Sequence, residues 1–196
     1  MNVSEDIKKY LPQYLSDGAK GALVRSLGEY PNNLNSIFME DAYYNTHKDK
    51  ILQADVFECK NIYENINAKI MVISNSCDNS EENQRFIPIN ISYIPLIDLG
   101  KLKEKLETDK FDKEKIDNFM NAVKKQQITS MFYIPAQNDS NSEMVALFDS
   151  PMSTGLKIFK SKIVKKIYSL SNYGFYIFLF KLSYHFTRIK EGTQRG

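Results

Sequence analysis

A short apolar run that stops in a polar cluster constrains the fold of this chain more than any other feature. Ile70 to Ile73 are consecutive apolar residues rich in β-branched types, and residues 74–80 are Ser, Asn, Ser, Cys, Asp, Asn and Ser. A run of this kind, bounded by turn-forming residues, predicts a buried strand that delivers a loop. The loop brings hydroxyl, amide, thiol and carboxylate groups together within a few residues, which makes it the first place to look for chemistry.

Several other segments have the alternating or apolar patterns of strands. Residues 86–93 alternate with period two, which predicts a strand with one wet face, and Pro88 favours an edge position or a bulge. Residues 62–66 fit either a hairpin partner or a short connection. The expected strands are Leu52–Cys59, Ile70–Ser74, Arg85–Pro95, Ile128–Ile134, Glu143–Phe148 and Ile163–Leu170.

Helical spacing of apolar residues appears at both ends and in the middle of the chain. Near the N-terminus Ile7, Tyr10, Leu11, Tyr14 and Leu15 repeat at helical spacing, Pro12 predicts a kink, and a second helix is expected from Ala19 to Leu27. Residues 32–50 are expected to be a loop with at most one helical turn. Asp98 and Asp112 are expected to cap two further helices, and the last helix is expected at Asn172–Lys190.

The length of 196 residues favours one domain, 1–196, of the α+β class. Within it we expect a helical N-terminal extension over 1–50 and a strand-rich core over 51–170. The helices at 98–125 would be an insertion in that core, and residues 171–190 would form a C-terminal helix.

Composition indicates a folded protein outside the membrane. The chain is 42% hydrophobic and 12% aromatic, which is enough for a sizeable core. The apolar run from Phe175 to Phe180 is far shorter than the roughly 20 residues that a spanning helix needs. Two cysteines do not make a disulfide framework, and Met1 to Asp6 lacks the apolar region of a signal peptide, so a cytoplasmic location is expected.

The net charge of +2 conceals a basic C-terminal region. Residues 157–196 contain nine Lys and Arg residues against one Glu, with tyrosines interleaved. A basic segment on an acidic body is typical of nucleic-acid binding, and it is also the ordinary appearance of a solvated helix face. Lys165 and Lys166 are the candidate phosphate contacts in this region.

The polar loop supplies the candidate catalytic residues, Ser76, Cys77 and Asp78. Cleavage of RNA without a metal needs a base for the 2′-hydroxyl, a proton donor for the leaving oxygen and positive charge at the phosphate. Asp78 would be the base, Ser76 the donor, and Lys69 or Arg85 the phosphate contact. The alternative is a turn whose side chains bind its own backbone.

Two further interpretations concern single residues. Cys77 would be a nucleophile if His47 or His185 acted as its base. Asp55 lies within an expected strand, where a structural role bonding backbone amides is favoured over catalysis. The sequence lacks the P-loop, dinucleotide and HExxH motifs and has no Cys and His pair at metal-ligand spacing, so no cofactor and no metal are expected.

Three segments, taken in order, resemble the MazF/PemK toxin family. LQADVF at 52–57 resembles the family's opening Gly-Asp-Ile/Val strand, KIMVISN at 69–75 resembles its next strand, and FIPINISYIPL at 86–96 resembles the strand after that. The resemblance implies that the core is a small SH3-like antiparallel β-barrel with helices packed against it. It also implies, in active members, an endoribonuclease that cuts single-stranded RNA.

The chain departs from the family pattern at the positions that carry catalysis. Ala54 stands where the family has Gly, and Ala68-Lys69 stand where active members have Arg-Pro. Pro95 is followed by Leu96 rather than by Ser or Thr. The family's catalytic residues therefore have no counterparts at these positions.

Three functions are compatible with these observations. The first is an RNA-binding MazF/PemK-like protein, either catalytic or a non-catalytic relative, with a role in toxin–antitoxin systems or phage defence. The second is a non-catalytic module that binds a partner protein through its apolar helices. The third is a thiol enzyme that depends on Cys77. The sequence leaves the oligomeric state open, with a homodimer as one expectation.

Overall fold

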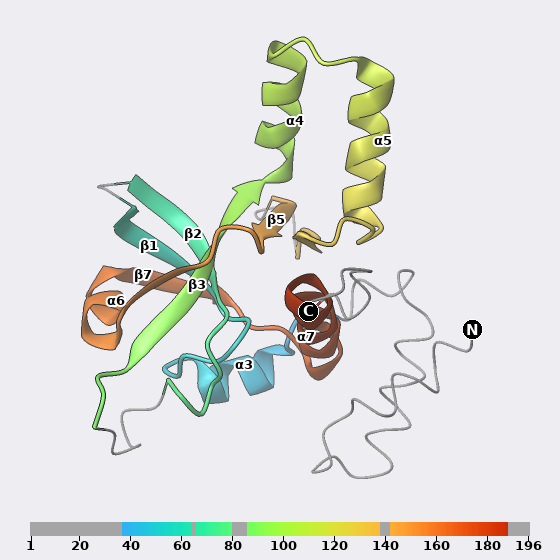
Figure 1. The fold of residues 1–196 in the computed structure, drawn as a ribbon. Coiled ribbons are helices and arrows are strands. Elements are labelled where there is room, and N and C mark those ends of the chain that lie inside the picture. The colour runs from blue at the N-terminus through green and yellow to red at the C-terminus, as the bar shows by residue number, and fades with distance from the viewer. Residues whose placement is uncertain (1–36, 64–65, 80–85, 138–141, 188–196) are drawn as a thin grey trace, which may run out of the picture.

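One antiparallel sheet with helices around it forms the part of the chain that the computed structural model describes, residues 37–63, 66–79, 86–137 and 142–187 (Figure 1). These ranges contain five helices and seven strands, so the expected α+β class is confirmed. The elements are α3 (Asp41–His47), β1 (Val56–Tyr63), β2 (Ile66–Val72), β3 (Asn90–Asp98), α4 (Leu99–Thr108), α5 (Lys113–Lys124), β4 (Met131–Ile134), β5 (Met144–Leu147), β6 (Met152–Gly155), α6 (Leu156–Lys162), β7 (Ile163–Tyr168) and α7 (Asn172–Thr187).

The strands follow the order β4-β5-β3-β2-β1-β7, and β6 pairs with β3. β1 and β2 form a hairpin in which Val56 faces Met71, and β2 pairs in turn with β3. β5 and β6 both pair with β3, β5 with residues 96–98 and β6 with residues 90–93. In the described strands β4 and β7, at the two ends of this order, do not pair with each other, so the path is open and is not closed into a barrel.

The central apolar run is buried on both faces of the sheet. Ile70, Met71 and Val72 are all fully buried, and because side chains alternate along a strand, they divide between two cores. Met71 belongs to the core that α7 covers, together with aromatic residues of the β4 and β5 region. Ile70 and Val72 belong to the opposite core, which α6 closes with Leu156 and Phe159. The strand predicted from this run is therefore present, and it ends at Val72.

α4 and α5 form a helical hairpin that projects from one end of the sheet (Figure 1). Asp98 caps α4 by accepting a hydrogen bond from the backbone N–H of Lys101 at 3.0 Å, and Asp112 caps α5 in the same way through Lys115. The apolar stripe of α5 packs on Tyr133 and Val145 to form a third core. Both capping residues act as the sequence predicts.

α7 is anchored by aromatic packing and by one buried lysine. Phe178 packs edge-on against Phe132 and Phe148, with ring centroids 5.6 and 5.9 Å apart. The Lys181 ammonium donates to the backbone oxygens of Gln126 and Ile128 and to the Gln126 side chain at 2.9–3.0 Å. No helix in the described ranges is long and apolar enough to cross a membrane.

The structure corrects several element boundaries. β1 begins at Val56 rather than Leu52, because residues 52–55 form a turn in which Ala54 has a φ of 69°. β3 begins at Asn90 rather than Arg85. β6 and α6 were not predicted, since four- and seven-residue elements are too short to establish a period. The helices expected over 4–27 lie outside the described residues.

Candidate functional site

The turn after β2 is fastened to β3 by Ser74. Its hydroxyl accepts a hydrogen bond from the backbone N–H of Ser92 at 2.5 Å and donates to the Ser92 carbonyl at 3.3 Å. The backbone N–H groups of Ile73 and Ser74 donate to the same carbonyl. Ser74 therefore extends the pairing of β2 with β3 beyond the last residue of the strand.

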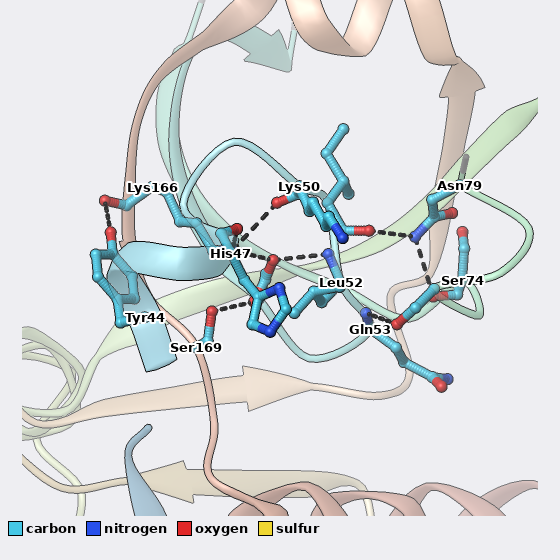
Figure 2. Close-up of polar contacts among 12 residues, drawn as sticks. Tyr44, His47, Lys50, Leu52, Gln53, Ser74, Asn79, Lys166 and Ser169 are labelled. Atoms are coloured by element: carbon cyan, nitrogen blue, oxygen red, sulfur yellow. Dashed lines mark hydrogen bonds and ion pairs between the residues drawn. The ribbon is translucent and has the colours of Figure 1, made fainter. Parts of the chain in front are cut away.

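Other side chains of the turn bind backbone atoms, and this network reaches Ile51 and Gln53 (Figure 2). The Ser76 hydroxyl accepts from the backbone N–H of Gln53 at 2.8 Å, and the Asn75 side chain accepts from the N–H of Cys77 at 2.9 Å. The buried Asn79 amide donates to the carbonyls of Ile51 and Ser74. These contacts account for the Ser and Asn residues as parts of a built turn.

A pocket of about 740 Å³ lies between this turn and the segment that leads into β3. We call it the corner pocket. Phe86 in its wall is fully exposed, Ile87 is 75% exposed, and both stand beside polar groups of Asn75, Asp78 and Asn90. The pocket therefore combines an uncovered aromatic ring with amide and carboxylate groups. Its lining is Ser74, Asn75, Asp78, Phe86, Ile87, Pro88, Ile89, Asn90 and Ser92.

Asp55 and Lys166 form a buried ion pair beside the turn, part of which is drawn in Figure 2. The Lys166 ammonium lies 2.7 Å from the Asp55 carboxylate, and the two side chains are 5% and 1% exposed. Asp55 also accepts from the Ser169 hydroxyl and from the backbone N–H of Leu52, while Lys166 donates to the carbonyls of His47 and Lys50. The group joins β1, β7 and the segment after α3, so Asp55 has the structural role that the sequence favoured.

Burial dominates the electrostatics of this pair. It raises the pKa of the Asp55 carboxyl above its ordinary value, although Lys166, Ser169 and the Leu52 N–H each lower it. The Lys166 ammonium is directed inward and is occupied by three acceptors. We therefore do not carry Lys166 forward as a phosphate contact, although the sequence nominated it.

Lys69 and Lys165 lie on neighbouring strands on either side of Glu58. Glu58 faces Lys69 across the β1–β2 pairing and faces Lys165 across the β1–β7 pairing. The Lys165 ammonium lies 3.4 Å from the Glu58 carboxylate and its side chain is 65% exposed. The structure thus brings these two nominated lysines together, near the β7 edge of the sheet and outside the lining of the corner pocket. Arg85 lies outside the described residues.

The residues of the thiol hypothesis lie on three separate segments, with Cys77 in the turn after β2, His47 at the end of α3 and His185 on α7. Cys77 is exposed, whereas Cys59 is buried, and burial raises the pKa of Cys59 to about 11. His185 lies on α7 with its Nε2 atom 3.2 Å from Asp149. His47 ends α3 with its Nδ1 atom buried. A nucleophilic role for Cys77 stays a prediction.

Phe86, Asn90 and Ser92 are pocket residues that sequence reasoning did not nominate. They belonged to a segment predicted as a strand from Arg85 onward, in which Phe86 would have been an ordinary strand residue. The sequence signal is Pro88, which favours an edge position or a bulge, and the structure shows that β3 begins only after it, at Asn90. Within the described ranges no group of His, Cys, Asp and Glu side chains is arranged to hold a metal ion.

Comparisons with known proteins do not assign the chain to a family. A scan against protein-family models finds no match, and a search of curated proteins finds none either.

Proposed function

We propose that this protein binds single-stranded RNA, with the corner pocket receiving an unstacked base. The observation that carries the proposal is the exposed Phe86 ring at the rim of a pocket lined with amide, carboxylate and hydroxyl groups. Sequence-tolerant binding of single strands depends on aromatic rings on which bases stack, each worth about 1–3 kcal/mol. Asn75, Asp78 and Asn90 offer the donors and acceptors that read the edge of such a base.

Positive charge on the same molecule supports the proposal. Lys69 and Lys165 flank a single carboxylate, and the exposed Lys60, Lys157 and Lys160 follow on adjacent segments. Phosphate contacts of this kind supply sequence-independent affinity that falls with added salt. An RNA strand that places one base in the corner pocket and continues across the sheet would bring more distant phosphates toward these lysines.

The connection between β6 and β7 supports an SH3-like curvature of the sheet. α6 follows β6 and precedes β7 without a linker, and its seven residues span only about 10 Å. In a flat sheet β6 and β7 would be about 19 Å apart, because three strands separate them. A curled sheet relieves this mismatch, and such curvature supports an SH3-like architecture even though the strand path is open and not closed into a barrel.

The resemblance extends the proposal to cleavage. Asp78 would take the proton of the 2′-hydroxyl, the 2′-oxygen would attack the phosphorus, and Ser76 would protonate the departing 5′-oxygen, which leaves a cyclic phosphate. Ser76 accepts a hydrogen bond from Gln53 and still has its own proton to donate. A metal-independent ribonuclease of this type fits a toxin–antitoxin or phage-defence role.

The test is binding of a fluorescently labelled single-stranded RNA, measured by anisotropy over a range of salt concentrations. The Phe86→Ala variant should bind roughly 5- to 150-fold more weakly, as expected for the loss of one stacking platform. Lys69→Ala and Lys165→Ala should each reduce the salt slope by about 0.7, the value for one phosphate contact on a single strand.

Phe111→Ala is the matched control, because Phe111 is also an exposed phenylalanine, 58% exposed, and lies between α4 and α5. It should bind RNA as the unmodified protein does. Equal affinity of the Phe86→Ala and Phe111→Ala variants would contradict the assignment of the base to the corner pocket. A cyclic phosphate product that disappears with Asp78→Asn would support cleavage.

A further inference from the structure

α7 carries apolar or aromatic side chains around most of its circumference, interrupted by Ser183 and His185. Its inner face, with Tyr173, Ile177 and Phe178, is buried in the first core. On its outer face Phe180 and Tyr184 are 55% and 56% exposed, and their rings stack with centroids 6.5 Å apart. Lys181 is the one Lys, Arg, Asp or Glu residue between 172 and 187, and its ammonium points inward.

Such a helix is typical of one that is covered on both sides. A surface helix of a globular protein has charged or polar residues opposite its apolar stripe, and a helix that is apolar all round is normally buried. The stacked rings of Phe180 and Tyr184 therefore form a flat apolar platform that lacks a solvating face. We call this platform the outer face of α7.

The chain enters the described structure beside the start of this helix. The carbonyl of Ile37 accepts a hydrogen bond from the backbone N–H of Ser171 at 2.8 Å, and Met39 donates to Ser169 at 2.9 Å. A side chain at Gly174 would overlap Ile37, so the backbone of Ile37 lies as close to α7 as a glycine permits. The first described residue, Ile37, therefore lies next to α7.

We propose that residues 4–27 of this same chain dock on the outer face of α7. The sequence predicts helices in this segment with apolar and aromatic residues on one face, Ile7, Tyr10, Leu11 and Tyr14 among them. Nine residues, 28–36, separate this segment from Ile37 in the sequence, and nine residues of extended chain reach at most about 30 Å, whereas α7 is about 24 Å long. That length is enough for the segment to reach any position along the helix. This docking is independent of RNA binding.

Hydrogen exchange of the full-length protein, followed by mass spectrometry, tests the proposal. In the unmodified protein the amides of residues 4–27 should exchange at least about tenfold more slowly than in an unstructured chain. The Phe180→Ser/Tyr184→Ser variant should lose this protection while β1, β2 and β3 keep theirs. The control variant Phe111→Ser/Ile158→Ser removes two comparably exposed apolar side chains elsewhere, and it should leave the segment protected.

A reciprocal change keeps the test informative if the α7 variant is poorly folded. Tyr10→Ser/Leu11→Ser alters only the proposed occupant, and it should increase the fluorescence of an added naphthalenesulfonate dye by uncovering the outer face of α7. Three results would overturn the proposal. They are an unprotected segment in the unmodified protein, protection unchanged by the α7 variant, and a dimer or vesicle-bound form that the α7 variant abolishes without affecting residues 4–27.

Discussion

Ala54 occupies a backbone conformation that side chains rarely adopt. Its φ is 69°, and its methyl group is fully buried in the first core. Its N–H donates to the carbonyl of Val72 at 2.8 Å, which fixes the turn that presents Asp55 to Lys166. A left-handed residue other than glycine costs about 1–2 kcal/mol. A glycine at this position would adopt the same φ without this strain.

The effect of an Ala54 substitution on the free energy of unfolding should therefore depend strongly on the shape of the new side chain. Ala54→Val should lower the free energy of unfolding by more than about 2 kcal/mol, because a β-branched residue at positive φ is a genuine outlier. Ala54→Gly should stay within about 1 kcal/mol of the unmodified protein, since relief of strain offsets the lost methyl and the added chain entropy. Urea denaturation would measure both, and equal effects of the two changes would contradict this account of the turn.

Lys165 and Lys166 are neighbours in sequence with opposite environments. Lys166→Met leaves the Asp55 carboxylate buried without its cation, which should cost about 3–5 kcal/mol of stability. Lys165→Met removes an exposed partner of Glu58 and should cost less than about 1 kcal/mol. Urea denaturation of the pair of variants is the measurement. Comparable losses would mean that the Asp55–Lys166 pair is not the structural connection we describe.

Among the helices, α7 is the one whose position depends most on a single glycine. Gly174→Ala should destabilise the protein by about 2–3 kcal/mol, because the added methyl overlaps the Ile37 backbone and neither side can move easily. Gly155→Ala is the control, because its added methyl would lie 3.9 Å from the nearest atom, Asn90 Oδ1. Thermal unfolding should show a lowered melting temperature for the first variant alone.

Lys181, which helps to attach α7, makes the free energy of unfolding depend on pH. Burial lowers the pKa of its ammonium from 10.5 to about 8. Between these values the unfolded chain binds more protons than the folded one, so the free energy of unfolding rises with pH. From about pH 7.5 to 9.5 the unmodified protein should gain about 1–2 kcal/mol relative to Lys181→Met. Burial raises the pKa of Tyr133. This shift makes the free energy of unfolding fall as pH rises, but only at pH values above this range. If the free energies of unfolding of the unmodified protein and of Lys181→Met changed with pH in parallel, that result would contradict the burial of a charged Lys181.

Elements in which an apolar pattern repeats several times, or which begin with a capping residue, could be predicted from the sequence. Short irregular elements could not. Asp98, Asp112 and the stripe of α5 predicted the helical hairpin because capping and periodicity are local properties. The turn at 52–55 depends on Asp55 meeting Lys166, more than a hundred residues away, and no local pattern reveals that contact. Ser76 and Asp78 could be nominated because they belong to a polar cluster that is local in the sequence. Phe86 became a candidate only when its exposure in the structure was known.

The arrangement of the three cores leaves the corner pocket at the margin of the second core, against which its lining residue Ile89 packs. α7 covers one face of the sheet, α6 closes the other, and the α4–α5 hairpin packs at one end. The turn after β2 extends beyond this packed region and is held by hydrogen bonds to Ser92 and Gln53. A rigid turn beside an uncovered aromatic ring is a suitable place for a ligand, since its polar groups are already oriented.

Photo-crosslinking offers the sharpest check on RNA binding at this pocket. A single-stranded RNA containing 4-thiouridine would be irradiated in complex with the full-length protein, and the crosslinked tryptic peptides identified by mass spectrometry. We predict the crosslink in the peptide of residues 86–101, which begins at Phe86, and its loss in the Phe86→Ala variant. Crosslinks confined to peptides outside the corner pocket, or none under saturating binding, would contradict the proposed function.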